Sequence, residues 1–467
     1  MAVTAPRKLD RSIVEGPVAT AVWRIAWPTM LQNAIAGLQG VIDHALVGNF
    51  VGFTANAGIG VSWQIFLVVM TFIGSLFTGM GVLAARYAGA GDSAQVNRVI
   101  YQALVATAIL CFGFLVPVGW FAAPWLLSIT NATPAVRHEA LPFLRIMFTC
   151  SAGLMVFFLL GGAMRAAGDA KTPLRLGIGL TVLNILFNVI LIPGLGPVPA
   201  LGTAGAAIGT CLASGTMAVY ALRQLWIGRW VVSFQHLPSY RPDWSVIREL
   251  FRFGLPAGVQ GVAMNVAGVL LLRFIGALPQ SAEAQGAWAV SYVELFSFIT
   301  WSSVGLMGAT ATVAGQNLGA GQPDRAALAA AAGARLGLVV AAVIGSLFVL
   351  IPGPLLALFG MTDPAANGIA TVLLRYLAVS GFFVTVALSF TGALQGTGDT
   401  RSPLAISVIS QIIVPLGLCT IFQATGTLEA SEIWLSVVCG HMTRATLSVW
   451  RFRQGKWRTI KVALKPA

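Results

Sequence analysis

Long apolar stretches alternate with short polar connections along almost the whole chain. A helix needs about 20 apolar residues to cross the hydrocarbon core of a bilayer, and twelve stretches reach that length. Spanning β-strands would instead be about ten residues long with alternating polarity. The pattern therefore predicts an all-α polytopic membrane protein with twelve transmembrane helices. They are expected at 23–48, 58–84, 99–127, 140–165, 173–193, 203–226, 250–276, 286–313, 327–358, 369–394, 403–424 and 431–451.

The polar connections differ in charge between the two sides of the membrane. Lys and Arg gather after the even-numbered spans and in both terminal segments, which include Arg7, Lys8 and Lys465. The opposite loops hold Arg137 as their only clear positive charge. Because cytoplasmic loops carry the excess of Lys and Arg, we expect both termini in the cytoplasm and the protein in the cell (inner) membrane.

Short motifs recur in the second half of the chain at a constant offset of 230 residues. Recurrence at one offset indicates a duplicated six-span unit, whose copies run in the same direction through the membrane. Transporters built from parallel repeats bind substrate between the halves. The matching pairs are Gly89-Ala90-Gly91 with Gly319-Ala320-Gly321, Gly168-Asp169 with Gly398-Asp399, Thr133-Pro134 with Asp363-Pro364, and Leu144-Arg145 with Leu374-Arg375.

The duplication gives the expected domain boundaries. Residues 1–227 form an N-terminal six-helix lobe, and 228–247, the longest polar stretch, form a cytoplasmic interlobe linker. Residues 248–467 form the C-terminal six-helix lobe and a basic cytoplasmic tail.

The first span contains a carboxylate, Asp43, which costs about 2.5–3.5 kcal/mol at membrane depth on insertion scales. Gln32, Gln39 and Asp43 fall on one helical stripe, which should face a bundle interior and not lipid. Pro28 lies in the same segment and predicts a helix bend. When Pro28 is aligned with Pro256, Asp43 falls on Leu271, so the symmetry of the fold does not require this acid.

Three other polar residues share the expected depth of Asp43. At about 1.5 Å per helical residue, Asn184 and Asn188 of the fifth span and Thr210 of the sixth lie in the same outer half of the first lobe. A carboxylate, two amides and a hydroxyl could hold a proton or a small hard cation. Alternatively, the Asn and Thr side chains only join helices by hydrogen bonds.

A second group of polar residues is a weaker candidate for a substrate or second ion site. Glu294 in span eight stands opposite Gln64 in span two under the repeat, and it is either a second proton or cation site or a structural acid. Gln39 and Asn265 complete this group.

Composition excludes several classes of function. Only 9% of residues are charged, against about 25% in soluble proteins. The net charge of +13 could suit nucleic-acid binding. The basic residues lie at span ends, however, which is typical of basic cytoplasmic loops. The five cysteines lie in apolar segments without CxxC, so we expect no metal site. No HExxH, GxSxG or Walker sequence occurs, so we expect neither an enzyme nor an ATP-driven pump.

These motifs resemble the MATE (multidrug and toxic compound extrusion) transporters over nearly the whole chain. The resemblance rests on the twelve spans, the repeat, Val-Ile-Asp after Pro28, the Ala-Gly-Asp turn, Gly-Ala-Met-Arg-Ala-Ala-Gly-Asp and Gly-Ala-Leu-Gln-Gly-Thr-Gly-Asp-Thr. It implies a secondary antiporter without cofactors that exports organic cations or amphiphilic drugs, acting as a monomer among membrane lipids. The implied ion-coupling residues are Asp43, Asn184, Asn188 and Thr210. Uncharged positions in spans seven and ten favour the DinF-like branch over NorM.

One departure from the family bears on the coupling ion. Many relatives carry Asp where this chain has Asn188, and the loss of one carboxylate favours H⁺ over the alternative, Na⁺. Other functions stay open: a flippase for lipid-linked precursors with the same architecture, an integral membrane enzyme, or a passive channel.

Overall fold

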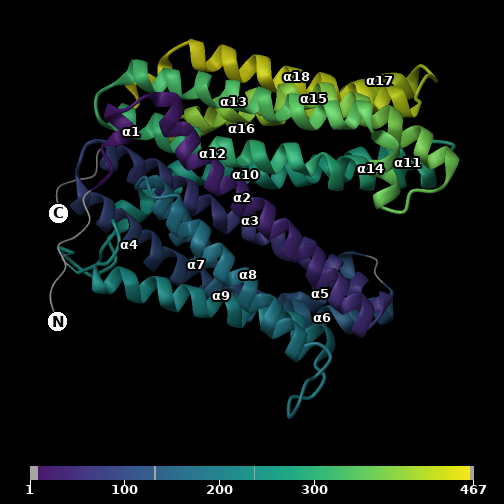
Figure 1. Ribbon diagram of the computed structural model, residues 1–467, viewed down its shortest axis with the longest axis horizontal. Helices are drawn as coiled ribbons and strands as arrows, with labels where there is room; N and C mark the ends of the chain where they lie inside the picture. Colours follow the sequence, from purple (N-terminus) through teal and green to yellow (C-terminus); the bar gives the residue numbers. More distant parts are fainter. Residues whose placement is uncertain (1–8, 131–132, 236, 463–467) are drawn as a thin grey trace. The chain divides into compact units, whose positions relative to one another are not determined.

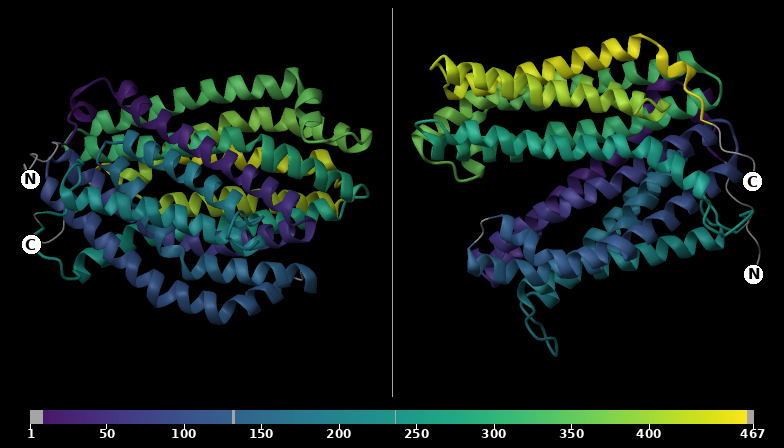
Figure 2. Two further views of the ribbon diagram at one scale, coloured as in Figure 1. Left: turned by 60° about the horizontal axis from the view of Figure 1, so that its bottom comes forward. Right: turned by 180° about the vertical axis from the view of Figure 1, so that it is seen from behind.

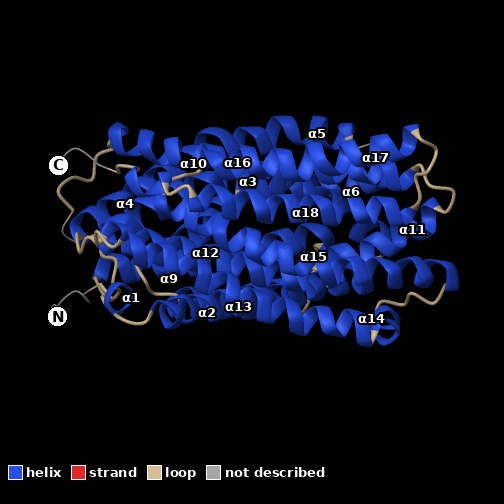
Figure 3. Ribbon diagram, turned by 90° about the horizontal axis from the view of Figure 1, so that it is seen from above, coloured by secondary structure: helices blue, strands red, loops and turns tan. Residues whose placement is uncertain are grey.

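The structure, a computed structural model, describes residues 9–130, 133–235 and 237–462. All regular secondary structure in these residues is helical (Figure 3). The predicted all-α class is therefore confirmed. The terminal charges Arg7, Lys8 and Lys465 lie outside the described residues.

Each of the twelve predicted spans corresponds to a long helical segment (Figure 1). The first six are α2 (Val18–Phe50), α3 (Phe53–Gly89), α4 (Ser93–Leu110) continued by η1 (Cys111–Leu115), η2 (Val118–Ala122) and α5 (Ala123–Ile129), the bent pair α6 (Pro134–Thr149) and α7 (Ser151–Ala166), α8 (Lys171–Leu191), and α9 (Gly202–Ile227). The last six are α10 (Trp244–Gly276), α11 (Ser281–Trp288) with η3 (Ala289–Leu295) and α12 (Ser297–Gly319), α13 (Pro323–Leu350), α15 (Pro364–Thr397), α16 (Arg401–Val408) with η4 (Ile409–Ile413) and α17 (Val414–Ala424), and α18 (Ala430–Arg453). The short elements are α1 (Ser12–Glu15), α14 (Pro352–Leu358) and η5 (Lys456–Thr459).

Most of these segments are apolar enough to cross a membrane. In the described parts of the chain, nine helices meet the requirement of length and hydropathy, and the pair α6 and α7, bent by 54°, makes a tenth span. The remaining two, α2 with 33 residues and α18 with 24, are long enough but more polar. Their polarity reflects side chains such as Asp43 in α2 and Arg444 in α18. Ionisable side chains are costly in a membrane span and therefore rare.

The repeated Gly-Asp motif adopts the same turn in both halves. Gly168 and Gly398 have φ angles of 98° and 101°, a region that favours glycine. The following acids, Asp169 and Asp399, accept a backbone hydrogen bond from the residue three positions on, at 3.0 and 3.2 Å. The duplicated sequence therefore encodes a duplicated helix connection.

Packing divides the described chain into two units. The first holds 9–10 and 31–258, and the second holds 11–30 and 259–462. Helices α2 and α10 therefore each begin in one unit and end in the other. In both helices the boundary between the units lies two residues after a proline, Pro28 or Pro256. A main-chain hydrogen bond is missing at each proline. These two units are defined by packing and not by the sequence repeat. The six-span lobes expected from the sequence therefore remain a prediction.

The second unit is built around α15. Helices α12, α13 and α18 all pack along it (Figures 1 and 2), and 72% of the residues in its most apolar 18-residue stretch are buried. Small residues permit the close approach. A Cβ added to Gly396 of α15 would collide with the backbone of Ala311 in α12.

The stretch between α9 and α10, expected as an interlobe linker, packs onto the first unit. Val232 and Phe234 are fully buried there, and Tyr101 of α4 stacks edge-on against Phe234 and Tyr240. Arg98 of α4 forms an ion pair with Asp243 at 2.5 Å. The described residues of this connection, 228–235 and 237–243, are therefore a packed part of the unit.

Candidate functional site

The polar stripe of α2 faces helices α7 and α8 in the first unit. Gln39 accepts a hydrogen bond from Thr181 Oγ1 of α8 at 2.9 Å. Gln32 accepts one from Arg165 Nη1 of α7 at 3.4 Å. Since each partner comes from another helix, the stripe faces protein along its length.

Asp43 ends this stripe and begins a chain of hydrogen bonds. Asn188 Nδ2 donates to Asp43 Oδ1 at 2.8 Å and to Asn184 Oδ1 at 3.3 Å. Asn184 Nδ2 in turn donates to Thr210 Oγ1 of α9 at 3.0 Å. The Thr210 hydroxyl in turn donates a hydrogen bond to the carbonyl oxygen of Ala206 at 3.0 Å. The structure thus brings all four predicted ion-coupling residues into one network, which we call the Asp43 network.

The interior of this network is closed to solvent. Asn184 and Asn188 are both 0% exposed, whereas Asp43 and Thr210 are half-buried. The two asparagines are four residues apart on α8, so both point from one helical face. Of the two half-buried members, Asp43 is the one with a charge, so it is where a proton or ion could enter.

One buried atom of the network has no partner. Asn188 Oδ1 is buried and accepts no hydrogen bond. Gly209 of α9 lies directly against it, and a Cβ at that position would collide with this oxygen. A buried amide oxygen without a donor is costly, so this oxygen keeps an unused capacity to accept a hydrogen bond.

The charge balance of the site is simple. No Lys or Arg in the described residues forms an ion pair with Asp43. The described chain contains no group of three or more His, Cys, Asp or Glu side chains that could hold a metal ion. The network can therefore offer one formal negative charge together with neutral amide and hydroxyl oxygens.

The weaker candidates lie outside this network. Gln64 is exposed on α3. Asn265 is exposed on α10 and donates to the Gly261 carbonyl of its own helix at 2.9 Å. Glu294 is exposed in the π-helical turn η3, a kind of turn that is frequent at functional sites. Their predicted role as a substrate or second ion site remains a prediction.

Sequence reasoning missed two partners of the stripe, Thr181 and Arg165. Thr181 lies three residues before Asn184, on the face that carries the two asparagines, so helical spacing could have indicated it. Arg165 belongs to the Gly-Ala-Met-Arg motif, but nothing in the motif specifies its contact with Gln32.

Comparison with known proteins adds the family context. The family model MatE matches the chain twice, at residues 28–190 and 256–421. The two matches begin at Pro28 and Pro256, the prolines that the internal repeat pairs.

Curated relatives align over nearly the full chain. A "Probable multidrug resistance protein NorM" of Thermotoga maritima is 26% identical over 442 residues, covering 93% of this chain and 92% of that protein. The "Multidrug resistance protein MdtK" of Pectobacterium atrosepticum is 23% identical over 438 residues, covering 92% and 94%.

Solved structures share the twelve-helix fold. A multidrug resistance MATE family transporter of the MOP superfamily, solved in its outward-facing conformation, superposes with a TM-score of 0.88 at 20% identity. The match covers 98% of this chain and 100% of the other.

Proposed function

Because this chain belongs to the MatE family, whose members are membrane transporters and not enzymes, we propose that it is a multidrug antiporter. It exports organic cations or amphiphilic drugs across the inner membrane in exchange for protons. The names of the relatives, multidrug resistance proteins, support the substrate class. The protein acts as a monomer, and both termini lie in the cytoplasm.

The observation that carries this proposal is the contact between Asp43 and Asn188. Withdrawal from water favours the neutral form of a carboxyl group, whereas the hydrogen bond from the Asn188 amide favours the charged form. These opposing influences make the protonation state of Asp43 sensitive to the arrangement of α2 and α8. A change in that arrangement therefore binds or releases a proton.

The Asn188 amide can respond to both states of the carboxyl group. To the charged carboxylate it presents its Nδ2, as in this structure. A protonated Asp43 becomes a donor and needs an acceptor, and the unpartnered Asn188 Oδ1 is available on the same amide. Gly209, which has no side chain, leaves room for this oxygen in its present position.

Exchange transport follows if drug and proton favour different conformations. A ligand shifts a conformational equilibrium only by its difference in affinity for the two states. Such coupling is reciprocal, so loading with drug must weaken proton binding by the same factor.

The proton is preferred over Na⁺ because the network has a single formal anion. Hard cations are bound by several oxygen ligands that usually include carboxylates, and Asn184, Asn188 and Thr210 are neutral. One desolvated carboxylate is sufficient for one proton.

The test is drug uptake into inverted membrane vesicles with one gradient imposed at a time. A pH gradient without Na⁺ should drive uptake, and dissipating it should release the drug. Uptake driven by a Na⁺ gradient at equal pH, and lost when K⁺ replaces Na⁺, would overturn the assignment of the ion. Uptake that no ion gradient affects would overturn antiport itself.

A further inference from the structure

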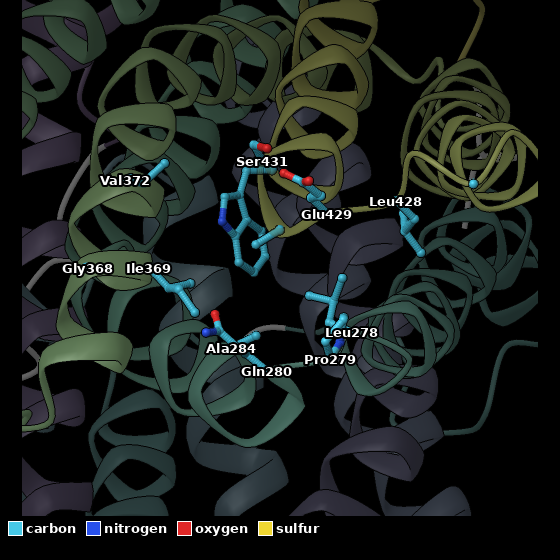
Figure 4. Close-up of a pocket in the computed structure, with 13 residues that line it drawn as sticks. Leu278, Pro279, Gln280, Ala284, Gly368, Ile369, Val372, Leu428, Glu429 and Ser431 are labelled. Carbon is cyan, nitrogen blue, oxygen red and sulfur yellow. The ribbon is translucent and has the colours of Figure 1, made fainter.

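A cavity of about 670 Å³ lies in the second unit, among the ends of α10, α11, α15 and α18 (Figure 4). It lies at the opposite end of α18 from the basic residues Arg451 and Arg453. Its volume is within the range of about 300–1,000 Å³ that is usual for small-molecule sites. Its lining includes none of the residues of the Asp43 network.

One lining residue of the cavity belongs to a stack of aromatic rings. Trp434 of α18 is 1% exposed and lines the cavity. Trp288 stacks on it with ring centres 5.5 Å apart, and Tyr292 stacks on Trp288 at 4.0 Å. Such a stack gives a rigid surface, because each ring is held by the next.

This wall contains an unused hydrogen-bond donor. The buried Nε1 of Trp434 has no acceptor. Buried indole N–H groups usually have one, so this donor is an unsatisfied polar atom behind the cavity wall.

The charge on the cavity lining is negative. Glu429 is the only charged residue among those that line it, and its side chain is exposed. The capping box at the start of α18 holds Glu429 in place, because its carboxylate accepts the backbone N–H of Glu432. Glu432 adds a second carboxylate within the same turn. The electrostatic field at the mouth therefore favours a cation.

Most of the remaining lining residues are aliphatic, with Gln280 and Ser431 as polar exceptions. Leu278, Ile369, Val372 and Leu428 surround the space, as Figure 4 shows. An occupant must therefore combine an apolar body with its positive charge. We propose that this cavity is a binding site for a small amphiphilic amine, with the ammonium group at Glu429 and the apolar body between Leu428, Ile369 and Trp434.

The site is independent of the Asp43 network, and its test is a binding measurement. The full chain is purified in detergent with the background substitution Asp43→Asn, so that the outcome does not depend on proton coupling. The probes are protonated 4-phenylbutylamine and neutral 4-phenylbutanol, which share one apolar body. Calorimetric titration gives the affinity of each.

The decisive variant is Glu429→Gln, which keeps an oxygen for the helix cap and removes the charge. We expect it to weaken binding of the amine at least tenfold and to leave binding of the alcohol within twofold. Asp363→Asn is the matched control, because Asp363 caps α15 in the same unit but does not line the cavity. It should change neither affinity.

A second variant tests the cavity by volume. Val372→Trp places a large ring in the space, and we expect it to abolish binding of both probes while the thermal midpoint stays near that of the parent protein. Equal effects of Glu429→Gln and Asp363→Asn on the amine would overturn the proposal. So would amine binding that survives Val372→Trp, or the absence of binding at millimolar concentrations.

Discussion

Asn188 donates one amide hydrogen to Asp43 at 2.8 Å, while the oxygen of the same amide is buried without a partner. The two residues come from α2 and α8, so the contact joins the first helix of the unit to a helix far along the chain. A relative displacement of these helices changes this hydrogen bond directly.

Asp43→Asn should abolish coupled efflux, because it removes the only formal charge of the network while keeping its shape. We expect drug resistance to fall to the level of cells without the transporter. The purified variant should still insert in the membrane and elute as a single species. Wild-type transport by a correctly inserted variant would show that Asp43 is not the coupling residue.

Gly209→Ala should impair transport although Gly209 carries no chemistry. The added Cβ collides with Asn188 Oδ1 and displaces the amide from Asp43. A hydrogen bond to a charged group contributes about 1.5–3 kcal/mol, so we expect a shift of roughly one to two pH units in the pH dependence of uptake. Gly215→Ala on the same helix is the control, since its Cβ would point into open space. If both variants transported alike, the hydrogen bond between Asn188 and Asp43 would play no part in transport.

Glu294→Gln tests whether Glu294 is a second site. If it is, binding of cationic drugs should weaken by tenfold or more and binding of neutral ones should not, because only cations lose a charge partner. Affinities for a matched pair of drugs in purified protein give the answer. Equal losses for both drugs, together with a lower thermal midpoint, would mark Glu294 as structural.

Asp243 should contribute a pH-dependent part of the stability of the first unit. The Ser245 hydroxyl, followed by Arg98 and backbone N–H groups, lowers the pKa of Asp243 to about 2. The value in unfolded chains is about 3.9, so this contribution is complete above about pH 4 and is lost as the pH falls through the folded value.

Asp243→Asn should therefore lower the thermal midpoint by a constant amount between pH 8 and pH 5. The difference from the wild type should shrink as the pH is lowered from about 4 towards 2. Midpoints of both proteins in one detergent, measured across this range, test the expectation. A difference that grew at low pH would contradict it.

Gly396→Ala should destabilise the second unit, because the added Cβ meets the Ala311 backbone where α12 and α15 cross. Backbone cannot move aside as a flexible side chain can, and overpacking typically costs about 1–3 kcal/mol. Gly308→Ala on α12 should be neutral, since nothing lies within 4 Å of its added Cβ. Thermal midpoints and the yield of monodisperse protein compare the two variants.

The amino-acid sequence by itself determined the helices, their number and their duplication. Transfer of apolar residues into the bilayer is a local property that adds up along each segment, so ten of the twelve spans follow from length and hydropathy, and the more polar α2 and α18 from length and the repeat. The isolation of Asp43 was also visible, because Leu271 occupies its place in the repeat. Helical spacing placed Asp43 and Gln39 on one stripe, and both contact α8.

Only the tertiary structure decided which atoms meet. Spacing placed Asn188 near the depth of Asp43, but whether its amide donates depends on the rotation of α8 and on the absence of a side chain at Gly209. The contact of Arg98 with Asp243 before α10 and the cavity beside Trp434 likewise combine segments that are distant in sequence. Hydrogen bonds and cavities depend on orientations within fractions of an ångström, and these are set by packing between helices, whereas hydropathy is set by each helix alone.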